Sequence, residues 1–176
     1  GFYAPAQIVR DARAHGVAVL PPCMQSSQWA NRMEWLDRPG QPPDLALRLG
    51  FRQIKGIAED EARWITAARG NGYLAVQDVW RRAGTGPATL ARLAEADAFA
   101  ALGLARRDAL WAAEALAPGP ALPLFAADIE GEALLEPAVR FREMTVGEAV
   151  VEDYLTMRLT LRAHPMALLR PWLDAA

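Results

Sequence analysis

The chain has 176 residues, of which 52% are hydrophobic and 23% charged, so it can bury a core and hold one or two small domains. Its formal net charge of −2 weighs against a free-standing nucleic-acid-binding domain, because such domains are usually basic. Cys23 is the only cysteine, which excludes an internal disulfide and a zinc site built on paired cysteines. No apolar run reaches transmembrane length and no secretory signal is found, so we expect a cytoplasmic protein without a membrane partner.

The first fifty residues predict one helix and a small β element. The helix starts at Pro5 and ends before the next glycine, since proline suits a first helical position and glycine a terminus. Residues 17–20 (VAVL) predict a short strand that two prolines stop. Residues 45–51 alternate in polarity with a period of two, which predicts a strand leading directly into the following turn. The predicted partner strand lies around Trp29 and Trp35.

Residues 53–58 (QIKGIA) form an apolar turn with a central glycine, and a helix with acidic residues in its first turn follows from Glu59. This pattern is typical of a helix-hairpin-helix, in which Gly56 lets the backbone reverse and the free amides at the helix start attract a phosphate. Lys55, the only lysine of the chain, lies beside these amides. The motif alone leaves open a second interpretation, in which the glycine only makes a turn between two helices.

After this turn the chain is predicted to be mainly helical. We expect helices at about 59–69, 76–82, 87–93 and 106–116, and a last helix that starts at Pro165. A second, weaker hairpin signal at 94–99 lacks glycine, and we expect it to be structural. Residues 118–143 are rich in proline, alanine and acids and predict a linker, in which LPLF at 122–125 is anchored on another surface. The six tryptophans are predicted to be core or interface anchors.

The order of short motifs along the whole chain is more informative than any one of them. These motifs are GFYAP at 1–5, VRDAR at 9–13, LRLGF at 47–51, IKGI at 54–57, residues 90–107, LPLF at 122–125, VEDY at 151–154 and HPM at 164–166. In this order they resemble the bacterial C-family DNA polymerases of the polymerase III alpha type, and most of all the damage-induced, error-prone branch of the mutasome. Ala58 stands where that family usually has a second glycine, and Arg158 where a glycine is common.

The resemblance implies a mainly α fold with a small β element and three parts. Residues 1–43 would be the C-terminal end of the fingers region, 44–117 a tandem helix-hairpin-helix domain, and 118–176 a linker and helices leading toward a following OB-type domain. The chain, which lacks a start methionine, would be an excised piece. The catalytic aspartates of the family lie upstream in the palm, so we assign no catalytic or metal-binding residue and no cofactor here. The parent protein would be a DNA-directed DNA polymerase that uses Mg²⁺.

The expected function is duplex DNA binding without sequence specificity within an error-prone polymerase that acts in translesion synthesis. The expected DNA-binding residues are Arg52, Lys55, Gly56, Ile57, Ala58 and Arg63. Other mutasome proteins and the sliding clamp are further candidate partners. One alternative is a protein-interaction module of the mutasome that touches DNA little, which the acidic balance favours. Another is a hairpin module of an unrelated repair nuclease.

Overall fold

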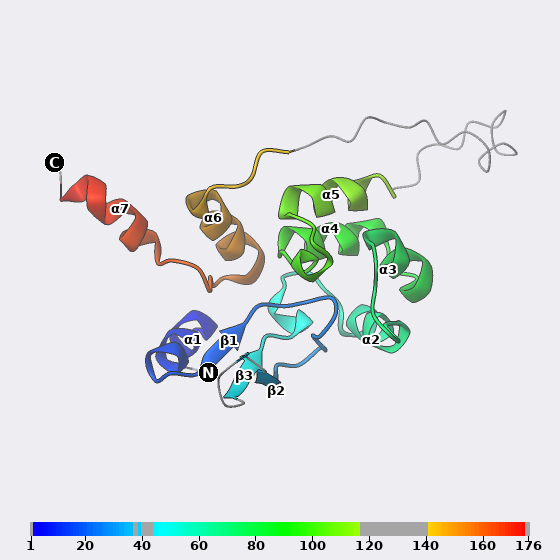
Figure 1. Cartoon of the computed structure of the whole chain (residues 1–176), viewed down its shortest axis with the longest axis horizontal. Coiled ribbons are helices and arrows are strands. Elements are labelled where there is room, and N and C mark those ends of the chain that lie inside the picture. Colours follow the sequence, from blue (N-terminus) through cyan, green and yellow to red (C-terminus); the bar gives the residue numbers. More distant parts are fainter. Residues whose placement is uncertain (1, 37–38, 40–43, 117–140, 175–176) are drawn as a thin grey trace, which may run out of the picture.

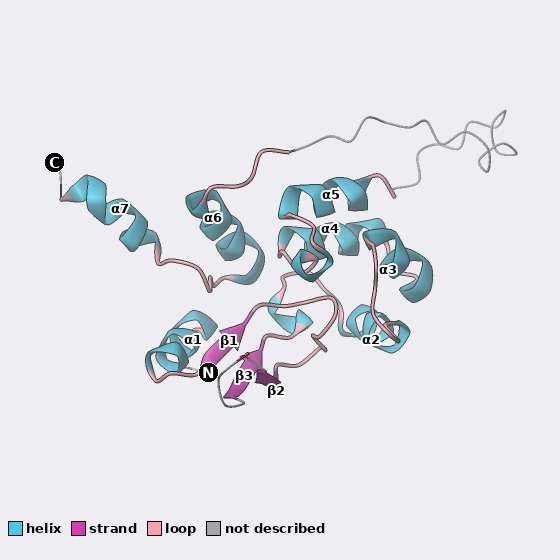
Figure 2. Cartoon of the chain, in the orientation of Figure 1, coloured by secondary structure: helices cyan, strands magenta, loops and turns pink. Residues whose placement is uncertain are grey.

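The structure, a computed structural model, describes residues 2–36, 39, 44–116 and 141–174. The described part is mainly helical with one small sheet, which confirms the predicted fold class (Figures 1 and 2). Its helices are α1 (Pro5–Ala14), α2 (Glu59–Ala68), α3 (Val76–Ala83), α4 (Pro87–Glu95), α5 (Arg106–Glu114), α6 (Val146–Met157) and α7 (Pro165–Leu173). Its strands are β1 (Ala18–Leu20), β2 (Arg32–Leu36) and β3 (Asp44–Arg48), and short 3-10 turns lie at Phe51–Gln53 and Ala100–Leu102.

The sheet has the order β1-β3-β2, with β3 parallel to β1 and antiparallel to β2. The predicted strands near 17–20 and 45–51 and the partner strand around Trp35 are therefore confirmed. The prediction that the strand runs on through Phe51 is wrong, because β3 ends at Arg48. The Phe51 amide donates instead to the Gln28 carbonyl at 2.8 Å, outside the ladder. The side chain of Phe51 is fully buried, so its place in the apolar alternation reflects burial in the core rather than strand pairing.

The core lies where helices α2 to α5 meet the turn that follows β3. Five large members are at most 1% exposed and come from this turn, α2, the segment before α3, α4 and the segment after α4: Phe51, Ile65, Tyr73, Leu90 and Phe99. Tyr73 is satisfied within this core, since its hydroxyl donates to the Ile65 carbonyl at 2.6 Å. Full burial of such side chains stabilises the fold by about 1.5–3 kcal/mol each. The first hairpin therefore begins directly after a fully buried core residue, Phe51.

Trp29 packs against this core, but the other five tryptophans do not lie in it. Exposed fractions are 69% for Trp35, 66% for Trp64, 39% for Trp80, 48% for Trp111 and 79% for Trp172. The prediction that they anchor the core is wrong for these five, because helices α2 to α5 fill the core with Leu, Ile, Val, Phe and Tyr. Their predicted role at an interface stays a prediction.

The sequence predicts domain boundaries near residues 43 and 118. β3 lies after the first of these boundaries, but it pairs with β1 and β2, which lie before it. The boundaries near 43 and 118 stay predictions. Most of the predicted linker, including LPLF at 122–125, lies outside the described residues. In the part of the chain that is described, no helix is both long and apolar enough to span a membrane.

Candidate nucleic-acid interface

The first hairpin is a tight turn between two buried isoleucines. Ile54 and Ile57 are 2% and 7% exposed, and between them Lys55 and Gly56 face solvent. Gly56 has φ +82°, a left-handed conformation that residues with a Cβ adopt at a cost of about 1–2 kcal/mol. The helix α2 begins three residues later, at Glu59. The side chain of Lys55 is thus held beside the start of a helix by the two buried residues on either side of it.

Two helices that follow later in the chain, α4 and α6, form hydrogen bonds to this turn. The Arg92 guanidinium of α4 donates to the Gly56 carbonyl at 3.0 Å. From α6, the Thr156 carbonyl accepts the Lys55 amide at 2.9 Å, and the Met157 carbonyl accepts the Gln53 side-chain amide at 2.8 Å. The Lys55 amide is therefore engaged within the protein, and only the Lys55 ammonium is offered outward. No local pattern in the sequence signals these contacts, which span up to about a hundred residues.

The amides at the start of α2 are only partly available to a ligand. The Ala58 amide donates to the Glu61 carboxylate at 3.4 Å, a long bond of the capping-box type. Glu61 also accepts the Thr89 hydroxyl at 2.5 Å, which fixes its carboxylate in place. Among the described residues the Gly56 amide has no acceptor. Because the Ala58 amide already has an acceptor and the Gly56 amide has none, the Gly56 amide is the more available of the two to an incoming phosphate.

Charges around the hairpin are mixed. Glu59, Asp60 and Glu61 occupy the first turn of α2, and Arg63 is paired with Glu59 at 2.6 Å on the exposed surface. A hollow of about 360 Å³ beside the turn is lined by two cations, Lys55 and Arg92, and two carboxylates, Glu95 and Glu152. The positive charge available to DNA at this turn is therefore confined to a few side chains and is surrounded by carboxylates.

The predicted site residues fall into three groups in the structure. Arg52, Lys55, Gly56 and Ala58 are exposed along one turn. The Ile57 side chain is buried, so only its backbone could meet a ligand, and its amide already points to the Ile54 carbonyl at 3.4 Å. Arg63 is exposed but turned toward Glu59. Their role in DNA binding stays a prediction.

The second hairpin lies beside a network of ion pairs, of which only the pair Arg106–Asp153 is buried. Asp97, at its turn, has φ +60° and pairs with Arg162 at 2.6 Å. Behind it, Arg106 of α5 pairs with Asp153 of α6 at 2.6 Å, and both side chains are less than a tenth exposed. Asp153 also accepts the Thr160 hydroxyl at 2.7 Å. This network connects α6 to the second hairpin, whose purely structural role stays a prediction.

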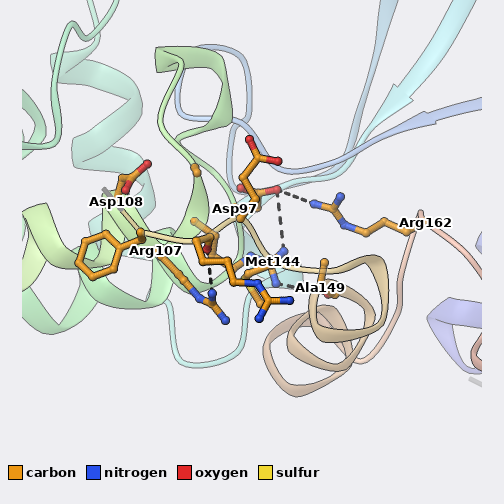
Figure 3. A pocket seen from close by; sticks show the side chains of 11 residues that line it. Asp97, Arg107, Asp108, Met144, Ala149 and Arg162 are labelled. Carbon is orange, nitrogen blue, oxygen red and sulfur yellow. Dashed lines mark hydrogen bonds and ion pairs between the residues drawn. The ribbon is translucent and has the colours of Figure 1, made fainter. Parts of the chain in front are cut away.

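A cleft of about 500 Å³ opens beside this network (Figure 3). In Figure 3, Arg162 extends toward Asp97 from the right, and Arg107 and Met144 lie below Asp97 in this view. Burial raises the pKa of Asp97, and Arg106 and Arg162 offset that rise only in part. Both arginines and carboxylates line this cleft, so it carries no strong charge of one sign. Across the described residues, no group of three His, Cys, Asp or Glu side chains could hold a metal ion.

Comparison with known proteins agrees with this geometry. A family model described as "Helix-hairpin-helix motif" matches residues 16–109, from the sheet through α5. Because this match covers more than half of the chain, the chain belongs to the helix-hairpin-helix family.

The chain is also similar to curated proteins that are named error-prone DNA polymerases. The chain is 59% identical over 173 residues to an error-prone DNA polymerase of Ruegeria pomeroyi. It is 52% identical over 177 residues to error-prone DNA polymerase 3 of Agrobacterium fabrum, and 46% over 177 residues to the error-prone DNA polymerase of Brucella abortus. Each match covers at least 97% of this chain but only 15–16% of the relative's length. The resemblance to the error-prone branch of the C-family polymerases is confirmed, and it disfavours the repair-nuclease alternative.

Proposed function

We propose that this chain binds duplex DNA without sequence specificity and positions it within an error-prone DNA polymerase. The observation that carries the proposal is the helix-hairpin-helix match over residues 16–109, which includes a turn that exposes Lys55 at the start of α2. The names of the relatives supply the polymerase setting, and we extend it to translesion synthesis in the cytoplasm. The whole protein would be the DNA polymerase, with its Mg²⁺ and catalytic aspartates outside this chain.

In this proposal one phosphate lies beside the turn at Gly56. The Lys55 ammonium and the Gly56 amide would contact its oxygens, and Arg52 would lie against a neighbouring phosphate. Such contacts fix the register of a duplex without reading bases, which suits an enzyme that copies any sequence. Ile57 acts from the core by holding the turn in shape, and Glu61 keeps the Ala58 amide capped. Ala58 and Arg63 would flank the phosphate rather than hold it.

The acidic first turn of α2 limits how many phosphates this site can take. Glu59, Asp60 and Glu61 repel a second phosphate near the helix start. We therefore expect few contacts, and a slope of log affinity against log salt of about −1 to −3 for duplex DNA. Within the parent protein, residues 1–43 would close the fingers region, 44–117 would form the tandem domain, and 118–176 would lead toward the next domain.

The test is equilibrium binding of the 176-residue chain to labelled duplexes of unrelated sequence, followed by fluorescence anisotropy from low to moderate salt. The proposal predicts equal affinities for the sequences and a negative salt slope. Binding to one sequence only, or a flat salt response, would contradict it.

A protein-interaction module of the mutasome is the second candidate, and specific observations favour it. Five tryptophans are at least 39% exposed, and tryptophan is a residue type enriched at protein–protein interfaces. An apolar hollow of about 500 Å³ also lies between α6 and α7, lined by residues such as Val151, Leu155 and Leu169. If this candidate is right, the chain binds a purified sliding clamp or another mutasome protein, and its DNA binding has a salt slope near zero.

A further inference from the structure

A further hollow lies between α1 and the turn that joins α6 to α7. It has a volume of about 460 Å³. We call it the α1 cleft and define it by five of its lining residues: Arg10, Arg13, Tyr154, Arg162 and His164. Three arginines line it, and no carboxylate does. The acid on the same helix, Asp11, is turned toward His15 at 3.5 Å. The charge offered by this cleft is therefore positive only.

Two donors of the cleft, Arg13 and His164, are held in position by the protein itself. The Arg13 guanidinium donates to the Leu161 carbonyl at 2.8 Å, which leaves further N–H groups of the fork unused. The Nδ1 atom of His164 accepts the Met166 amide at 3.2 Å. In the neutral ring the proton then lies on Nε2, so His164 presents a donor away from its own helix. Donors fixed in this way lose little freedom when a ligand arrives.

The three arginines differ in how much charge they contribute. Arg162 is neutralised by Asp97 at 2.6 Å and by Asp153 at 3.4 Å. Arg10 and Arg13 have no ion-pair partner among the described residues. About two positive charges thus remain without a counter-charge in this hollow, whereas the hollow beside Lys55 has equal numbers of cations and carboxylates. An anion would find the stronger field at the α1 cleft.

We propose that the α1 cleft binds a backbone phosphate of a nucleic-acid strand, as a second contact apart from the hairpin. The planar forks of Arg10 and Arg13 match phosphate oxygens, and His164 Nε2 supplies a further donor. Tyr154, 36% exposed at the rim, offers an aromatic face on which a base or sugar of that strand would lie. This inference rests on the proposed DNA-binding function, because a nucleic acid is the polyanion that the helix-hairpin-helix family match indicates.

The test compares Arg10→Ala with Arg81→Ala in the 176-residue chain. Both arginines are exposed on helices, and neither forms an ion pair among the described residues, but Arg81 lies on α3, on the opposite side of the molecule (Figure 1). Anisotropy titrations would use a labelled single-stranded oligonucleotide and the matching duplex over a series of salt concentrations. Arg10→Lys, which keeps the charge, tests for rescue. Circular dichroism melting confirms that each variant is folded.

The proposal predicts that Arg10→Ala weakens binding about 3–10-fold and makes the salt slope shallower by about 0.7 for the single strand or 0.9 for the duplex. Arg81→Ala should stay within about twofold of the parent, and Arg10→Lys should restore most of the affinity. An effect on only one oligonucleotide identifies which form of DNA occupies the cleft. If Arg10→Ala binds like the parent while Lys55→Ala is weaker, this inference is wrong and the hairpin function stands. If the parent chain binds neither oligonucleotide, both fail.

Discussion

Loss of the buried carboxylate Asp153 should destabilise the chain strongly. In Asp153→Ala the guanidinium of Arg106, 7% exposed, loses its partner at 2.6 Å. Removing one member of a buried ion pair costs about 3–5 kcal/mol, because the other charge stays buried without compensation. Asp97, at 3.9 Å from Arg106, remains as a weaker partner, so we expect the lower end of this range. The thermal midpoint should fall by roughly 6–12 °C, at about 2–4 °C per kcal/mol for a chain of this size.

Urea unfolding and calorimetry at pH 7 measure this loss directly. The matched control is Arg107→Met, since Arg107 is the next residue on α5 but its pair with Glu148 at 3.2 Å is exposed. The control should cost no more than about 1 kcal/mol. The double variant Arg106→Met with Asp153→Leu should recover most of the stability lost by Asp153→Ala, because paired charges are replaced by apolar groups. A loss from Asp153→Ala no larger than that from the control would refute the claim that this network holds α6 in place.

Three other predictions concern the backbone and pH. Gly56→Ala should cost more than Gly16→Ala in urea unfolding. Both glycines have left-handed φ, worth about 1–2 kcal/mol, but only at Gly56 would a Cβ meet an arginine side chain, at 2.9 Å. Equal losses would contradict the close contact. Arg158→Gly should stabilise the chain by about 0.5–1 kcal/mol, because Arg158 ends α6 at φ +59°; a loss of stability would count against strain there. Arg48 donates to Glu34 and holds the pKa of Glu34 below its ordinary 4.5. The stability from this charge is present above that value and is lost as pH falls through the lowered one. Glu34→Gln should thus cost about 1 kcal/mol or less at pH 7, and in thermal melts this cost should shrink as the pH falls below 4.5; a pH-independent loss would refute this.

Local signals in the sequence were sufficient for most elements. Proline at the first position marks the start of α1, α4 and α7, and the strand near 45 follows from the period of two in its side chains. The same period misplaces the end of that strand, because Phe51 is buried by packing in the core rather than by strand pairing. The period also does not report burial residue by residue, since Leu45 is 41% exposed whereas Ala46 is fully buried.

The surroundings of the hairpin could not be predicted in the same way. The turn at Gly56 follows from a local pattern, but its braces come from Arg92 and from the end of α6 near Thr156. Contacts over such separations leave no local periodicity to read. The pair of Arg106 and Asp153 is a further example, since each looks like an ordinary surface charge on a helix until the two helices meet.

The measurement that tests the central claim most directly is the salt dependence of duplex binding for the parent chain and Lys55→Ala, with Arg81→Ala as control. If Lys55 contacts a phosphate, Lys55→Ala binds duplexes of every sequence more weakly, and its salt slope is shallower by about 1, while Arg81→Ala keeps the parent slope. Equal affinity and an unchanged slope for Lys55→Ala would contradict DNA contact at this hairpin.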